Sequence, residues 1–237
     1  MVNDLEHGRG AHSPRPILPR GAVWAGHRFK EAGEVKLYDS AYAPNARRVR
    51  IYLAEKGIAV PMEQVDLAAL QQKSAAYTAI NPLQRVPALV LDDGTLIAES
   101  IAICRYLEAS NPSPPMFGVG ALEQAKVEMW NRQIEHYLFL PVAQVFRHLH
   151  PAMKDMEVPQ IASWGEANKP RAATFLPILE RQLEIGPFVC GARYSVADIT
   201  ALVAIDFMKP AKLAVPPEHI NIARWRAEVS ARPSAKA

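Results

Sequence analysis

NPLQRVPALVLDDGTLIAESIAICRYL, residues 81–107, is the stretch of sequence that decides the fold. It reads as a loop, a strand that follows a proline, a tight turn, a second strand and a helix. Val86 precedes Pro87, which pushes it toward extended geometry, and a proline cannot donate to a sheet ladder. We therefore expect a strand edge here, with the backbone N–H and C=O of Val86 facing a ligand. The bond between the two residues can be cis at a cost of only about 0.5–1 kcal/mol.

The second half of this stretch predicts a hairpin and a helix start. Asp93-Gly94 is a strong turn signal between an apolar run and a return strand over residues 95–98. Ser100 then begins a helix, and the free N–H groups and dipole of a helix start attract a carboxylate. An extended backbone beside such a helix start describes a pocket for a small acidic peptide.

Three features in this order resemble the glutathione-binding half of the glutathione transferase superfamily. They are Val86-Pro87, the pair Glu99-Ser100, and the run SIAI over residues 100–103, which fits the family's Ser-x-Ala-Ile pattern. The resemblance implies an α/β thioredoxin-like N-terminal domain followed by an all-α C-terminal domain. It also implies that Val86, with Pro87 behind it, pairs with the cysteinyl backbone of glutathione. Glu99 and Ser100 would hold the γ-glutamyl end, and Arg85 would meet the glycyl carboxylate.

Composition fits two small domains and narrows the range of partners. The chain has 237 residues, 49% hydrophobic and 22% charged, with a formal net charge of +3. That charge is too small to predict a nucleic-acid partner, and no apolar run approaches the roughly 20 residues of a membrane helix. Cys104 and Cys190 form no CxxC or metal pattern, so we expect buried, reduced thiols, no metal and a cytoplasmic protein.

The chain divides into three parts by pattern. Residues 1–34 lack a period and an apolar stretch, so we expect a disordered extension. Residues 35–117 fit a thioredoxin-like glutathione-binding domain, and residues 118–237 an all-helical domain. In the first, a helix over residues 44–56 should stop at Gly57, and a strand should span residues 58–66. In the second, helices are expected over residues 122–149, 164–185, 195–208 and 222–230, with Ser195 and Asp198 as a capping box.

The turn after the first strand, residues 40–48, should face the bound thiol if the resemblance holds. Ala43 occupies the position at which relatives carry a serine or cysteine, and alanine can neither donate a hydrogen bond nor attack. Asn45 is the best replacement, because Ala-Pro-Asn resembles the Thr-Pro-Asn turn of bacterial nu-class transferases. Lowering a thiol pKa by one to two units requires about 1.4–2.7 kcal/mol, and one hydrogen bond to a charged group supplies about 1.5–3 kcal/mol. Tyr42 and Ser40 are the rival donors.

For the arginines, aromatic residues and histidines of the helices, the sequence predicts only a general environment. Arg47, Arg48 and Arg50 are expected on a wet helix face. Aromatic residues near Tyr137 would wall an apolar pocket between the two domains. Several histidines lie on the same long helix, but their spacing predicts no metal site.

The resemblance implies a homodimeric glutathione transferase, in which a bound thiolate attacks a small hydrophobic electrophile. Two alternatives remain open. One is glutathione-dependent disulfide reduction, which the Ala-Pro-Asn turn allows. The other is a non-catalytic protein of the same fold that binds glutathione or another ligand, since Ala43 lacks the usual hydroxyl.

Overall fold

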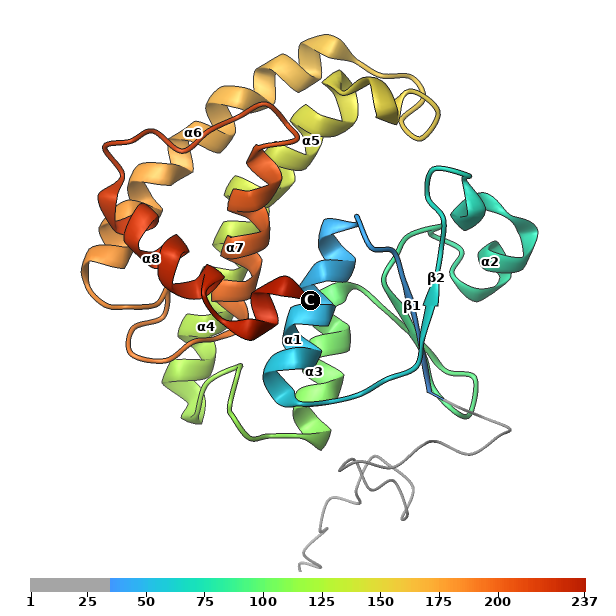
Figure 1. Ribbon diagram of the computed structural model, residues 1–237, viewed down its shortest axis with the longest axis horizontal. Helices are drawn as coiled ribbons and strands as arrows, with labels where there is room; N and C mark the ends of the chain where they lie inside the picture. Colours follow the sequence, from blue (N-terminus) through green and yellow to red (C-terminus); the bar gives the residue numbers. More distant parts are fainter. Residues whose placement is uncertain (1–34) are drawn as a thin grey trace, which may run out of the picture.

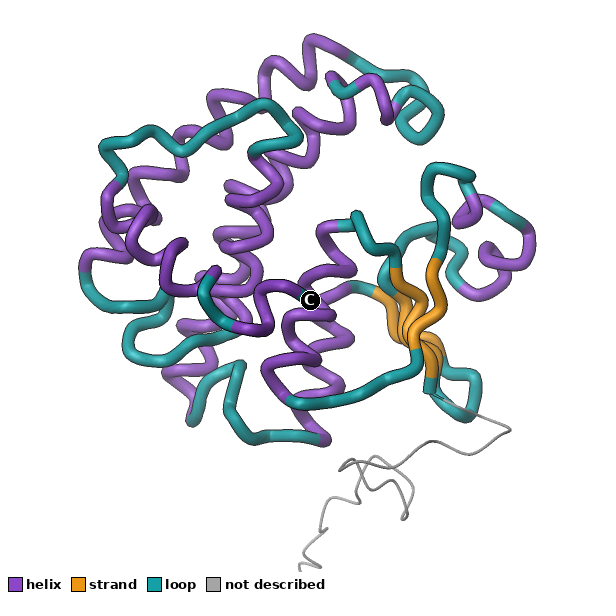
Figure 2. Tube along the Cα trace, in the orientation of Figure 1, coloured by secondary structure: helices purple, strands orange, loops and turns teal. Residues whose placement is uncertain are grey.

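The computed structural model describes residues 35–237, and Figures 1 and 2 show their arrangement. Residues 1–34, for which the sequence predicts a disordered extension, lie outside the described residues. The described chain forms a small sheet with its own helices, followed by a larger helical part (Figure 2).

Four strands form the sheet, in the order β2-β1-β3-β4. Their bounds are β1 (Lys36–Asp39), β2 (Met62–Gln64), β3 (Ala88–Val90) and β4 (Leu96–Ala98). β1 pairs parallel with β2 and antiparallel with β3, and β3 pairs antiparallel with β4. Because β3 lies between β1 and β4, the expected open edge at Pro87 is wrong. The strand expected over residues 58–66 is also shorter, with regular pairing confined to β2.

Three helices belong to the sheet domain. They are α1 (Pro44–Lys56), α2 (Ala75–Ile80) and α3 (Ser100–Ser110), and a 3-10 turn η1 (Gln71–Lys73) precedes α2. α1 has the predicted bounds, since Pro44 starts it and Gly57 ends it with a φ of 63° that glycine adopts without strain. In Figure 1, α1 and α3 lie between the sheet and the helical part, and α2 lies on the other side of the sheet.

The helical part begins with one long rod that changes winding in its middle. α4 (Gly120–Ile134) runs into a π-helical turn, η2 (Glu135–Phe139), and then into α5 (Leu140–Leu149). The predicted single helix over residues 122–149 did not include this turn. Pro141 lacks the N–H that would bond to the carbonyl of Tyr137, which favours a local change of winding. The remaining elements are η3 (Pro151–Met153), α6 (Ala162–Glu184), α7 (Val196–Met208), α8 (Ile220–Ser230) and η4 (Pro233–Lys236).

One hydrophobic core runs through both parts, from Leu37 and Ile51 to Leu138, Val203 and Trp225. The capping box at the start of α7 is confirmed, and it is buried in this core. The Asp198 carboxylate accepts from Ser195 N and Oγ at 3.0 Å, from Val189 N at 2.8 Å and from Trp225 Nε1 at 2.9 Å. Burial raises the pKa of Asp198 to about 6, although these four donors act in the opposite direction.

Candidate functional site

The sheet topology brings three chain segments to one end of the sheet. β1 and β4 both run antiparallel to β3, and the register places Tyr38 opposite Ala88 and Ala88 opposite Ala98. The ends of β1 and β4 therefore lie beside the start of β3. As a result, the start of α1, the peptide Val86-Pro87 and the pair Glu99-Ser100 gather at the same place.

The loop before β3 is held by two hydrogen bonds to a single carbonyl. Arg85 O accepts from the hydroxyl of Tyr77 at 2.7 Å and from Asn81 Nδ2 at 2.9 Å. The following bond between Val86 and Pro87 is cis. Within residues 35–237, the backbone N–H and C=O of Val86 make no hydrogen bond. Both groups are thus available to an extended peptide, beyond the end of β3 rather than along a sheet edge.

Glu99 adopts a backbone conformation that is rare for a residue with a side chain. Its φ is 68°, and it stands at the N-cap of α3 without a side-chain capping bond. Its carboxylate is exposed and has no hydrogen-bond or ion-pair partner within the described range 35–237. Ser100, the first residue of α3, is buried. Positive φ at such a residue costs about 1–3 kcal/mol and is concentrated at ligand-binding sites.

Ala43 packs against the loop that carries Val86. It is buried in a small apolar cluster with Ala46, Val65, Tyr77 and Val86. α1 begins directly after it, with no side-chain cap at this position. The cluster joins the α1 turn to the Val86 loop, and it leaves the start of α1 as a second uncapped helix end in the site, beside that of α3.

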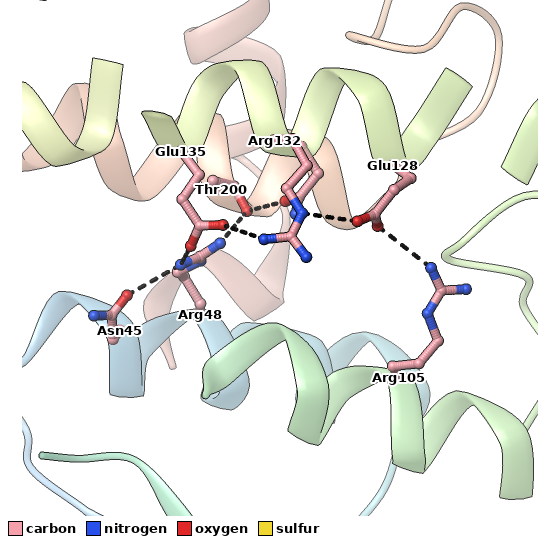
Figure 3. A network of polar contacts seen from close by, with 8 residues as sticks. Asn45, Arg48, Arg105, Glu128, Arg132, Glu135 and Thr200 are labelled. Carbon is pink, nitrogen blue, oxygen red and sulfur yellow. Dashed lines mark hydrogen bonds and ion pairs between the residues drawn. The ribbon is translucent and has the colours of Figure 1, made fainter. Parts of the chain in front are cut away.

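Asn45 is oriented by one neighbour. Its Oδ1 accepts from Arg48 Nη1 at 3.0 Å, whereas its Nδ2 donates to no group among residues 35–237. Figure 3 shows the amide oxygen turned to Arg48 and the amide nitrogen on the far side. The rival donors differ in position: Tyr42 is 99% exposed, and Ser40 is buried.

Arg85 is an exposed residue, and its guanidinium, which is partly desolvated, makes no hydrogen bond or ion pair in the described part of the chain. Burial and the charge of Arg147 lower its pKa, and Glu157 opposes this. Lys73 on η1 also donates to the carbonyl of Asp155 at 2.9 Å. Local sequence patterns carry no signal for such contacts, because they join residues about 60–80 positions apart.

The expected wet arginine face of α1 is wrong. Arg47 pairs with Asp206 at 2.8 Å, Arg50 pairs with Asp39 at 2.7 Å, and the side chain of Arg48 is only 1% exposed. The reason is tertiary: α1 lies between the sheet and α7, so no broad face of the helix is left to water (Figure 1).

Tyr137, which was expected to line an apolar pocket, is 60% exposed and stacks on Phe175, with ring centroids 6.2 Å apart. Cys104 is buried and Cys190 partly so, and burial raises the pKa of each thiol to about 12. Across residues 35–237, no three His, Cys, Asp or Glu side chains are grouped as metal ligands. No helix in that range is long and apolar enough to span a membrane.

A thioredoxin-like sheet, a helical second domain and a cis-proline loop beside two helix starts are typical of the class of glutathione transferases. Family models match the chain twice, as "Glutathione S-transferase, N-terminal domain" over residues 42–110 and "Glutathione S-transferase, C-terminal domain" over residues 151–233. The chain belongs to the glutathione S-transferase family, which confirms the resemblance and the fold class inferred from the sequence.

Individual relatives agree along most of the chain. Glutathione S-transferase 2 of Saccharomyces cerevisiae is 34% identical over 214 residues, covering 89% of this chain and 91% of that protein. The crystal structure of Gtt2 from Saccharomyces cerevisiae, 34% identical, superposes with a TM-score of 0.81 and covers 85% of this chain and 98% of that one. A glutathione S-transferase domain-containing protein of Marinobacter aquaeolei is 37% identical, also with a TM-score of 0.81, over 84% of this chain and 98% of that one.

Proposed function

We propose that this protein is an active glutathione transferase, which binds glutathione and promotes attack of its thiolate on a small hydrophobic electrophile. One observation carries the proposal. At the uncapped start of α1, Asn45 has its oxygen bound by Arg48, and its Nδ2 has no partner within residues 35–237. That nitrogen can donate to a sulfur anion at the place where Val86 offers an unpaired backbone.

The tripeptide would lie across the gathered segments. Val86, with Pro87 fixing its geometry, pairs with the cysteinyl backbone of glutathione. Glu99 accepts from the γ-glutamyl ammonium, while Ser100 and the first amides of α3 hold the γ-glutamyl carboxylate. Arg85 holds the glycyl carboxylate. Within residues 35–237, the side chains of Arg85 and Glu99 and the backbone of Val86 have no hydrogen-bond partner, which supports this placement of the ligand.

Thiolate stabilisation and orientation would supply the catalysis, without a covalent enzyme intermediate. A hydrogen bond from Asn45 to the charged sulfur is worth about 1.5–3 kcal/mol, enough to lower the thiol pKa by about one to two. We favour Asn45 over Tyr42 and Ser40, because Arg48 holds its amide oxygen and leaves the amide nitrogen for the sulfur. Tyr137 would contribute to the wall of the electrophile pocket. We also propose a cytoplasmic homodimer, as the family resemblance implies.

The test combines binding, turnover and titration. Calorimetry with reduced glutathione should show saturable binding, and an aryl halide should be conjugated. The ultraviolet absorbance of the bound thiolate gives its pKa, which should rise by about one to two in Asn45→Ala. Ser40→Ala and Tyr42→Phe serve as matched controls and should leave that pKa unchanged.

Other outcomes would select another function. Reduction of a glutathione mixed disulfide without conjugation would identify a disulfide reductase. Glutathione binding without turnover of either substrate would identify a non-catalytic protein. No binding of reduced or oxidised glutathione at millimolar concentration would refute the site itself.

A further inference from the structure

We propose that Arg48 is a positioning residue of this site: held by Thr200 and Glu135 of the helical domain, it orients the Asn45 amide toward the glutathione sulfur. The inference rests on the proposed function and deepens it. It assigns part of the thiolate stabilisation to Glu135 and Thr200 of the second domain, which act through Arg48 (Figure 3).

The direction of the Asn45 amide follows from chemistry. A guanidinium has five N–H donors and no acceptor, so only the oxygen of an amide can face it. Arg48 Nη1 lies 3.0 Å from Asn45 Oδ1, which forces Nδ2 to the opposite side. Without Arg48, either end of the amide could turn toward the sulfur, and the oxygen would repel a thiolate.

Arg48 is itself fixed by the second domain. Nη1 donates to Glu135 Oε1 at 2.9 Å, and Nη2 donates to Thr200 Oγ1 at 3.0 Å. The Thr200 hydroxyl then donates to Asn131 Oδ1 at 2.6 Å. Since a hydroxyl has a single proton, this bond leaves it as the acceptor for Arg48. Each group between Asn131 and Asn45 therefore has a donor facing an acceptor: Thr200 donates to Asn131, and Arg48 donates to both Thr200 and Asn45.

The burial of Arg48 is not explained by a gain in folding stability. Arg48, Thr200 and Asn131 are each no more than 1% exposed. Arg48 Nε and Asn131 Nδ2 are buried and have no hydrogen-bond partner within residues 35–237. A buried cation with an unsatisfied N–H adds little or nothing to net stability compared with well-packed apolar residues. A role in orienting Asn45 gives a reason for this cation.

The π-helical turn supplies two of the groups around Arg48. Glu135 begins η2, and Phe139 ends it with its ring centroid 5.3 Å from the guanidinium carbon. Such turns are rare and occur often at functional sites. The change of winding therefore lies where the second domain contacts the arginine that orients Asn45.

Arg48→Lys is the main test, with the pKa of enzyme-bound glutathione as the readout. Lysine keeps the positive charge but has one nitrogen, which cannot reproduce the planar fork toward Asn45, Glu135 and Thr200. We expect the thiol pKa to rise by about 1–2, as in Asn45→Ala. In the Asn45→Ala background, Arg48→Lys should add nothing further, because both changes remove the same hydrogen bond.

Arg47→Lys is the matched control. Arg47 is the adjacent residue of the same helix and also crosses to the second domain, through Asp206, but it does not contact Asn45. Its substitution should leave the thiol pKa unchanged. Thr200→Val tests the inference from the far side of Arg48, and it should raise the thiol pKa by up to about 1.

The outcomes separate this inference from the proposed function. An unchanged thiol pKa in folded Arg48→Lys, with a raised one in Asn45→Ala, would overturn the positioning role and leave the transferase proposal intact. If Arg48→Lys does not fold, Thr200→Val decides in the same way. An equal rise in Arg47→Lys would also overturn it, because any loss of a cross-domain arginine would then suffice. Failure of the unaltered protein to bind glutathione would refute both.

Discussion

Arg232 and Glu55 form a bidentate ion pair between the C-terminal segment and α1. Arg232 Nε donates to Glu55 Oε1 and Nη2 donates to Oε2, both at 2.7 Å. The hydroxyl of Ser234 also donates to Glu55, and the Arg232 guanidinium lies 4.2 Å from the ring centroid of Tyr194. Planar pairs of this kind are among the stronger charge-assisted contacts in proteins. These contacts hold the C-terminal segment against α1, the helix that carries Asn45.

Glu55→Gln should lower the free energy of unfolding by about 1–3 kcal/mol at pH 7, since it removes a charged acceptor shared by three donors. Burial opposes ionisation of Glu55, but the bonds from Arg232 and Ser234 outweigh it and hold the pKa of Glu55 below its usual value. The contribution is therefore present above the unfolded pKa, about 4.3, and is lost as pH falls through the lower folded pKa.

Urea unfolding of both proteins from pH 7 down to pH 3 measures this effect. The difference between them should narrow as the pH falls below about 4.3. Glu166→Gln is the control, because Glu166 pairs with Lys169 on an exposed face of α6 and should matter by less than about 0.5 kcal/mol. A difference that stays constant with pH would contradict the assignment.

Asp198→Asn should be much more damaging than its small change of shape suggests. The carboxylate accepts four hydrogen bonds, two on each oxygen. An asparagine presents an NH₂ group to two of these donors, and leaving them unsatisfied costs about 2–5 kcal/mol. Thermal and urea unfolding would measure the loss. Ser195→Ala removes a single donor and should cost only about 1 kcal/mol; equal losses would show that the carboxylate is not the centre of this network.

The two cysteines should be inert in the folded protein. With thiol pKa values of about 12, Cys104 and Cys190 carry almost no thiolate at neutral pH. Iodoacetamide at pH 7.5, removed before assay, should leave conjugation of an aryl halide unchanged, and mass spectrometry should find both thiols unmodified. Unfolding in urea should expose both to the reagent. Loss of activity with labelling of Cys190 would instead point to chemistry by a protein thiol.

Local signals in the sequence predicted much of this structure, and long-range contacts account for what they missed. Pro44 and Gly57 define both ends of α1 because their preferences depend on the backbone alone. The burial of Arg48 depends instead on partners 87 and 152 residues away, Glu135 and Thr200. Asn45 could be chosen from the Ala-Pro-Asn turn, but the direction of its amide could not, because Arg48 sets it.

Glu99 offers a test in which affinity and stability should move in opposite directions. Its carboxylate is exposed and unpaired within residues 35–237, and its φ of 68° strains any residue with a Cβ. Glu99→Ala should weaken glutathione binding by about 10–100-fold, the value of a charge-assisted hydrogen bond. Glu99→Gly should weaken binding equally but unfold with a free energy about 1 kcal/mol higher than that of the alanine variant.

Calorimetry and urea unfolding measure the two quantities on the same variants. Asp92→Ala is the control, because Asp92 is an exposed carboxylate in the turn at the opposite end of β3 and β4, and its removal should change neither. Unchanged affinity in Glu99→Ala would remove Glu99 from the site. A glycine variant less stable than the alanine variant would show that the conformation is not strained, because glycine alone gains from a positive φ. If both expectations hold, the strained backbone of Glu99 lowers the stability of the protein but places the carboxylate beside the start of α3. The γ-glutamyl group of glutathione would bind there.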